Sequence, residues 1–74
     1  MGMTPKGVKR IPVRIIELLE DYQGQILTKK FMYEKVWGSD YTPDKDATIH
    51  TNIRYARRSG ADIDLVYGIG YVIR

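Results

Sequence analysis

The sequence lacks cysteine and contains a single histidine among its 74 residues. The absence of thiols excludes disulfides and cysteine nucleophiles, and His50 alone cannot supply the ligands of a zinc site. No apolar run approaches the roughly 18 residues of a membrane span, and no signal-peptide pattern follows the basic start. A chain this short builds one thin core. We therefore expect a small cytoplasmic domain that is not an enzyme and needs no metal, cofactor or small-molecule substrate.

Positive charge exceeds negative charge only slightly, but it is unevenly distributed. Twelve Lys and Arg against nine Asp and Glu give a formal net charge of +3. Residues 1–14 and residues 47–58 contain cations and no acid, whereas acidic residues gather at 17–21 and 40–46. Such segregation favours a polyanionic partner on part of the surface. We interpret residues 1–11 as a basic arm, either bound to that partner or a disordered tail, and residues 12–74 as the folded domain.

Two helices are predicted in the first half of the chain. The spacing of apolar residues predicts a helix over 12–22, stopped by Gly24, and then a connector or very short strand. Thr28 is the expected N-cap of a second helix, and Gly38 is its expected end. Trp37 is predicted to lie in the core, closing this helix against a later hairpin.

A third helix is predicted after a polar loop at residues 38–46. Asp46 is its natural N-cap and Gly60 its stop signal. Its apolar stripe is narrow and consists of three residues one turn apart, namely Ile49, Ile53 and Ala56. The rest of its circumference is polar and basic, so this helix is expected to pack along one seam and to present its other faces outward.

The last segment changes from helical to alternating periodicity, which predicts a β-hairpin over residues 62–73 with a glycine-flanked tip. Gly68 and Gly70 are interpreted as turn residues of that tip. Three short helices followed by a hairpin are the order of a winged helix-turn-helix, an α+β fold with a C-terminal β-hairpin wing.

Four segments also resemble, in order, the winged-helix DNA-binding domain of the OmpR/PhoB-type response regulators. They are residues 24–28 (GQILT), 36–38 (VWG), 48–54 (TIHTNIR) and 66–71 (VYGIGY). The resemblance implies a recognition helix at residues 47–58, a wing at 63–73, and a loop at 38–46 that in the family contacts RNA polymerase. The family's receiver domain and N-terminal sheet have no counterpart, which suggests a stand-alone minimal version of the kind that a phage or mobile element carries.

Two departures from the family pattern affect the expected reading of DNA. Tyr67 stands where the family commonly has a wing arginine, which weakens the expectation of minor-groove contact. Arg54-Tyr55 stands where the family commonly has two arginines, so the sequence preference should differ.

The predicted site follows from the faces of these elements. Base edges are expected to meet the centre and flanks of the third helix, at Thr51, Tyr55, Asn52 and His50. Phosphates are expected to meet Arg54, Arg57, Arg58, Thr48, Lys29 and Lys30. The wing residues are Tyr67, Gly68, Ile69 and Gly70. About four to six cations would then reach phosphates.

The expected function is sequence-specific binding of double-stranded DNA and regulation of transcription on the nucleoid, with paired or tandem copies at a real operator. Two alternatives remain open. The chain could be a protein-interaction module that docks on RNA polymerase or a host regulator through the loop at 38–46, or an architectural factor that directs recombination. A continuous basic face over the third helix, the start of the second helix and the wing would favour DNA, whereas a broad exposed apolar patch would favour a protein partner.

Overall fold

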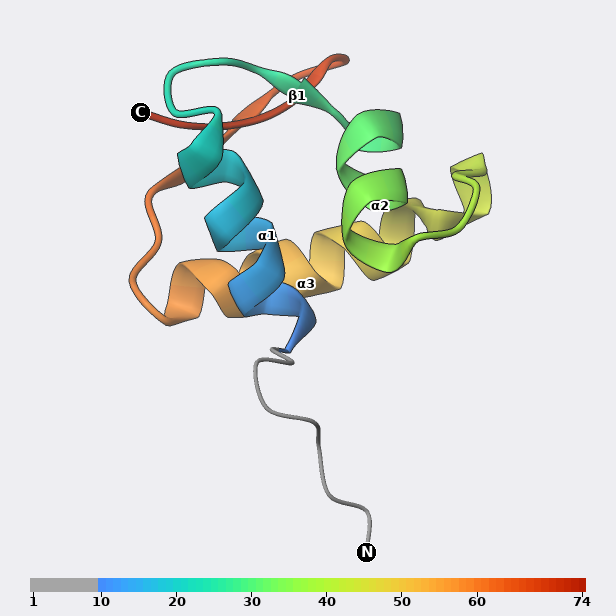
Figure 1. The fold of residues 1–74 in the computed structure, drawn as a ribbon, viewed down its shortest axis with the longest axis horizontal. Helices are drawn as coiled ribbons and strands as arrows, with labels where there is room; N and C mark the ends of the chain where they lie inside the picture. The colour runs from blue at the N-terminus through green and yellow to red at the C-terminus, as the bar shows by residue number, and fades with distance from the viewer. Residues whose placement is uncertain (1–9) are drawn as a thin grey trace, which may run out of the picture.

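The computed structural model describes residues 10–74 as three helices below a small sheet (Figure 1). The elements in chain order are α1 (Ile11–Asp21), β1 (Leu27–Thr28), α2 (Lys29–Trp37), a 3₁₀ turn η1 (Pro43–Lys45), α3 (Asp46–Arg58), β2 (Ile63–Val66) and β3 (Gly70–Ile73). Helix α3 lies across one end of the molecule, α1 and α2 stand on it, and the sheet covers the other end. The predicted α+β fold of three helices and a C-terminal hairpin is confirmed. Most of the predicted N-terminal arm lies outside the described residues.

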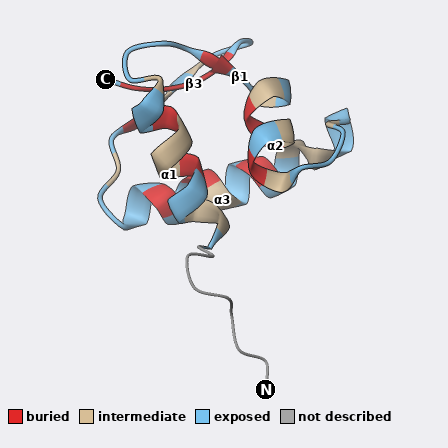
Figure 2. Ribbon diagram, in the orientation of Figure 1, coloured by how far each residue is buried: buried red, intermediate tan, exposed pale blue. Residues whose placement is uncertain are grey.

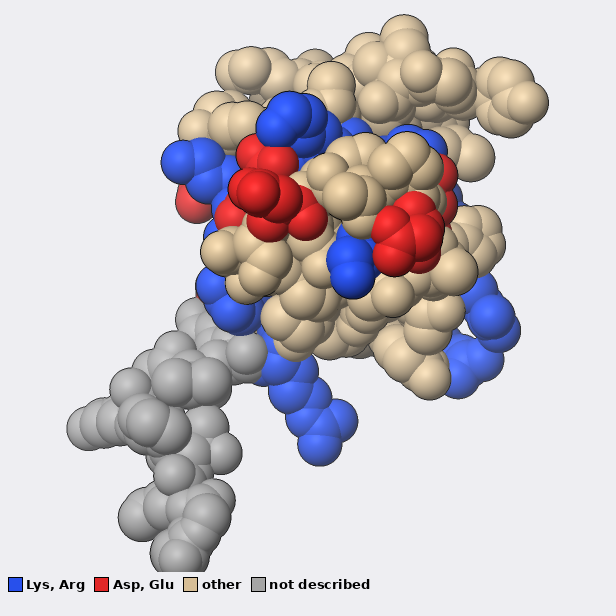
Figure 3. All heavy atoms as spheres, turned by 90° about the vertical axis from the view of Figure 1, so that its right-hand side faces the viewer, with Lys and Arg blue, Asp and Glu red and all other residues tan. Residues whose placement is uncertain are grey.

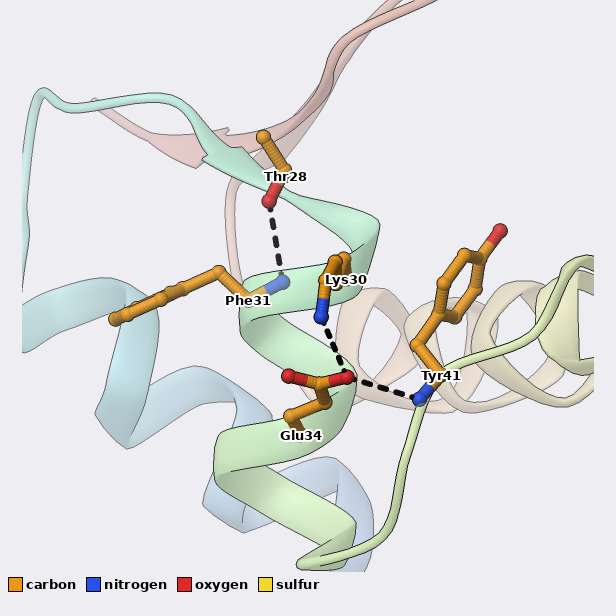
Figure 4. A network of polar contacts seen from close by, with 5 residues as sticks. All are labelled: Thr28, Lys30, Phe31, Glu34 and Tyr41. Carbon is orange, nitrogen blue, oxygen red and sulfur yellow. Dashed lines mark hydrogen bonds and ion pairs between the residues drawn. The ribbon is translucent and has the colours of Figure 1, made fainter.

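Helix α2 begins and ends at the predicted residues. The Oγ1 atom of Thr28 accepts a hydrogen bond of 3.1 Å from the backbone N–H of Phe31, as an N-cap should (Figure 4). Gly38 adopts a left-handed conformation, with φ of 74°, directly after the last helical residue. These local signals confirm the predicted boundaries of α2.

The start of α3 differs from the prediction. Asp46 is the first residue of the helix and Lys45 occupies the N-cap position without a side-chain capping bond. The carboxylate of Asp46 instead accepts a hydrogen bond of 2.7 Å from the Nζ atom of Lys29 and another from the hydroxyl of Tyr41. The prediction of Asp46 as an N-cap was therefore wrong, because partners from α2 and from the preceding loop take its oxygens.

The core lies where the three helices meet the inner face of the sheet, as the buried stretches in Figure 2 show. The predicted stripe of α3 is confirmed, since Ile49, Ile53 and Ala56 are fully buried. They pack with residues of every other helix and strand, including Ile15, Leu19, Leu27, Met32, Val36, Ile63 and Tyr71. One thin but continuous core thus holds α3 along a single seam.

Trp37 does not close α2 against the hairpin. It is partly buried, and its ring stacks on the buried ring of Tyr33, with centroids 4.6 Å apart and planes 13° from parallel. Tyr33 also makes an edge contact with Tyr41 of the loop after α2. The indole therefore helps to hold that loop against the helix, and the predicted partner of Trp37 was wrong.

The sheet has the strand order β1-β3-β2 and is antiparallel throughout. Gly70 lies in β3, between Thr28 of β1 and Val66 of β2. A Cβ atom at this position would lie 1.9 Å from the carbonyl oxygen of Leu27, whereas Gly68 at the tip has a positive φ of 77°. Gly68 is thus a turn residue as predicted, but Gly70 is required for the close approach of β1 to β3.

Candidate nucleic-acid interface

The outward face of α3 lies opposite its buried stripe. Thr51, Arg54 and Arg58 are exposed there, because they fall half a turn away from Ile49 and Ile53. Within residues 10–74, neither guanidinium has an ion pair or a hydrogen bond. The side chain of Thr48 is also exposed, on the flank of α3 next to Thr51. This face offers two free cations and hydroxyl groups, which suits contact with phosphates and base edges.

Arg57 has a different role from its two neighbours. Its Nε atom donates a hydrogen bond of 2.9 Å to the carbonyl oxygen of Ile63, the first residue of β2. This bond ties the end of α3 to the start of the hairpin. Of the three arginines expected on phosphates, the structure therefore leaves Arg54 and Arg58 free on the outward face.

The two lysines at the start of α2 are both paired within the domain. Lys29 binds Asp46, and Lys30 lies 2.8 Å from the carboxylate of Glu34. The same carboxylate oxygen of Glu34 accepts a hydrogen bond of 3.1 Å from the backbone N–H of Tyr41 (Figure 4). Acidic and basic side chains are accordingly interspersed on the face that carries α2 and its following loop (Figure 3). A basic face continuous from α3 onto α2 is not observed.

These pairs shift the pKa values of their members. The hydrogen bond from Lys29, followed by that from Tyr41, lowers the pKa of Asp46 below its ordinary value of 3.8. The hydrogen bond to Asp46 in turn raises the pKa of Lys29. The contact of Asp46 with both α2 and the loop links the two helices of the helix-turn-helix, and sequence spacing alone did not indicate it.

We expect Asp46→Asn to lower stability at neutral pH, because the ion pair with Lys29 is lost. A carboxylate with a depressed folded pKa stabilises the fold above its unfolded pKa, and this contribution disappears as the pH falls through the folded pKa. The difference between parent and variant in urea unfolding should therefore be constant near pH 7 and vanish well below pH 3.8. Asp40→Asn, an exposed carboxylate of the same loop, is the matched control. A difference that persists unchanged into acid would contradict this role for the ion pair.

A cleft separates α3 from the hairpin. Its volume is about 390 Å³, and its walls are Lys29, Asp46, Ala47 and His50 on one side and residues 65–71 on the other. His50 is exposed on the flank of α3 that faces this cleft. The predicted wing residues form the opposite wall, with Tyr67 and Ile69 exposed.

The other flank of α3 faces the start of α1. Tyr55 is half exposed and lines a shallow groove of about 520 Å³ together with Ile11, Pro12 and Val13. Asn52 lines the same groove, and its Nδ2 atom donates a hydrogen bond of 2.9 Å to the carbonyl oxygen of Thr48. The four residues expected on base edges are thus spread over three sides of the helix, with Thr51 at the centre.

An exposed, partly basic third helix beside a projecting hairpin defines the class of winged helix-turn-helix proteins. A family model described as "Transcriptional regulatory protein, C terminal" matches residues 7–73, and the chain belongs to this family. The resemblance inferred from the sequence is thereby confirmed. No helix in the described part of the chain is long and apolar enough to cross a membrane.

One named relative agrees with this assignment. The chain is 27% identical over 66 residues to the regulatory protein VanR of Enterococcus faecium, a match that covers 80% of this chain and 29% of VanR. The chain therefore spans less than a third of that relative.

Solved structures show the same fold. The DNA-binding domain of CpxR from E. coli superposes with a TM-score of 0.74 at 22% identity, over 90% of this chain and 72% of the chain in that structure. The DNA-binding domain of Bacillus subtilis CssR superposes with a TM-score of 0.75 at 23% identity, over 92% of this chain and 78% of the chain in that structure. The DNA-binding domain of Klebsiella pneumoniae RstA, solved in complex with the RstA box, superposes with a TM-score of 0.75 at 19% identity, over 90% of this chain and 72% of the chain in that structure.

Proposed function

We propose that this chain regulates transcription by binding double-stranded DNA, with α3 in the major groove and the hairpin on the far side of the adjacent strand. The observation that carries the proposal is the outward face of α3, where Arg54 and Arg58 make no bond within residues 10–74 and Thr51 lies one turn before Arg54. Membership of a family of transcriptional regulators, and the structure of the RstA DNA-binding domain in complex with the RstA box, support it. Acting on DNA, the protein would be cytoplasmic and would need no catalytic activity.

We assign roles by position on α3. Thr51 at the centre, and His50 beside the cleft, are the residues for base edges, because a helix in the major groove presents its outward face to them. Arg54, Arg58 and Thr48 are assigned to phosphates. Tyr55 and Asn52 face the start of α1, which suits contact with the neighbouring backbone better than base reading. The cleft of about 390 Å³ would seat the strand that separates the two grooves.

Two further expectations concern paired DNA sites and RNA polymerase. One α3 reads few bases, so we propose that functional DNA sites are paired or repeated. In this proposal the loop at 38–46 is the surface that contacts RNA polymerase. The structure of this loop does not favour the alternative in which the chain is only a protein-docking module. Its backbone and side chains are bound to α2 and α3 through Glu34 and Asp46.

Salt dependence of duplex binding tests the proposal. With Lys29 and Lys30 in ion pairs with carboxylates, about two to four cations remain for phosphates, so the slope of log K against log salt should be about −2 to −4. Gel-shift or anisotropy titrations on duplexes selected from a random pool would measure it. Failure to recover any bound duplex, or binding indifferent to salt, would contradict the proposal.

A further inference from the structure

The tip of the hairpin is apolar and carries no cation. Tyr67 is 93% exposed, the most exposed of the large apolar side chains in the described part of the chain, and Leu65 and Ile69 are each about half exposed. No Lys or Arg occurs between Arg58 and Arg74. The hairpin instead carries the carboxylate of Asp64, which pairs with Arg74 at 2.9 Å. The side chains of this tip therefore offer no positive charge to a phosphate.

The tip is a closed, hydrogen-bonded turn. Gly68 supplies the positive φ of the turn, and the backbone N–H of Ile69 donates a hydrogen bond of 2.9 Å to the carbonyl oxygen of Val66. This closed turn fixes the backbone of Tyr67 at the apex of the hairpin. An aromatic ring presented in this way loses little backbone freedom when it enters a binding site.

The position of the cleft determines where the tip would meet DNA. With α3 in the major groove, one sugar-phosphate strand would occupy the cleft between α3 and the hairpin. The neighbour of the major groove across one strand is the minor groove. Tyr67 and Ile69, on the far wall of the cleft, would then lie at the minor groove.

We propose that Tyr67 acts as an apolar wedge, whose ring enters the minor groove and inserts part way between two base pairs, so that binding kinks the duplex. The inference rests on the proposed DNA-binding function and extends it. Apolar side chains that enter the minor groove unstack a base step, and stacking of the ring on a base offsets part of that cost. Pyrimidine–purine steps deform most easily, so such a step is expected opposite Tyr67.

Energy transfer between fluorophores at the two ends of a selected duplex tests this inference. Binding of the parent 74-residue chain should shorten the end-to-end distance. Tyr67→Ala should abolish the bend and weaken binding about tenfold while leaving the salt slope unchanged, because no ionic contact is lost. Tyr67→Leu, which retains an apolar wedge, should retain the bend.

Two further variants separate a wedge from other roles of the tip. Tyr67→Arg should lose the bend but steepen the salt slope by about 0.9, since one phosphate contact is gained. Ile26→Ala truncates another exposed apolar side chain, 44% exposed and outside the hairpin, and should change neither bend nor affinity.

The outcomes distinguish this inference from the proposed function. A parent complex that binds duplex but leaves it straight overturns the wedge and leaves DNA binding intact. Absence of any duplex binding overturns the proposed function itself. If Tyr67→Ala leaves the bend unchanged but abolishes cooperative binding of a second copy, the tip contacts protein and the wedge is wrong.

Discussion

Charge reversal of both outward arginines, in the double variant Arg54→Glu and Arg58→Glu, should weaken duplex binding by roughly 100-fold at physiological salt. Two phosphate contacts and the counterions that they release are lost, and two carboxylates now repel the backbone. The salt slope should become shallower by about 1.8, because each contact contributes about 0.9. Both residues are exposed and make no bond within the described domain, so the melting temperature should change little.

A matched control reverses two charges elsewhere. Arg14 of α1 and Lys35 of α2 lie together on a face that α3 does not form. The double variant Arg14→Glu and Lys35→Glu changes net charge by the same amount, and it should leave the salt slope close to that of the parent. Equal loss of binding in the two double variants would show that overall charge, and not the face of α3, governs the interaction.

Ile53→Asp should abolish the folded state. Ile53 is fully buried on the seam by which α3 packs on the core, and no cation of the described domain lies in that core to pair with a carboxylate. Burial of an unpaired charge costs about 4–5 kcal/mol or more, close to the entire stability of a domain this small. Circular dichroism should show no cooperative melt. The neighbouring Arg54→Asp places the same carboxylate on the exposed face and should melt like the parent, whereas a cooperative melt of Ile53→Asp would contradict the assigned seam.

Features governed by local chemistry were predictable from the sequence. The Thr28 cap, the left-handed Gly38 and the apolar stripe of α3 depend on residues within one or two turns of each other, so spacing alone indicates them. The hairpin is equally local, because its turn and its alternation lie in one continuous segment. The fold followed from these elements and from their order.

Features governed by tertiary partners were not predictable in the same way. Asp46 has the residue type and position of an N-cap, but Lys29, 17 residues away, competes for its carboxylate. Arg57 resembles its neighbours in the sequence, yet only the return of the chain at Ile63 brings a carbonyl oxygen to its Nε atom. Tyr55 falls on the polar side of a helical wheel, but α1 begins beside it and forms a groove there. In each case a residue distant in the sequence determined the outcome.

The close approach of β1 to β3 at Gly70 joins the hairpin directly to the helix-turn-helix. Thr28 pairs with Gly70 in the sheet and also caps α2, so no loop separates the strand that pairs with the hairpin from the start of α2. The distance from α3 to the tip of the hairpin is then set by the protein. A DNA site with one base pair inserted between the two contacts would turn the second contact away by about a tenth of a helical turn, and the protein could not follow it. Spacing within the site, as much as base identity, would then decide which sequences are bound.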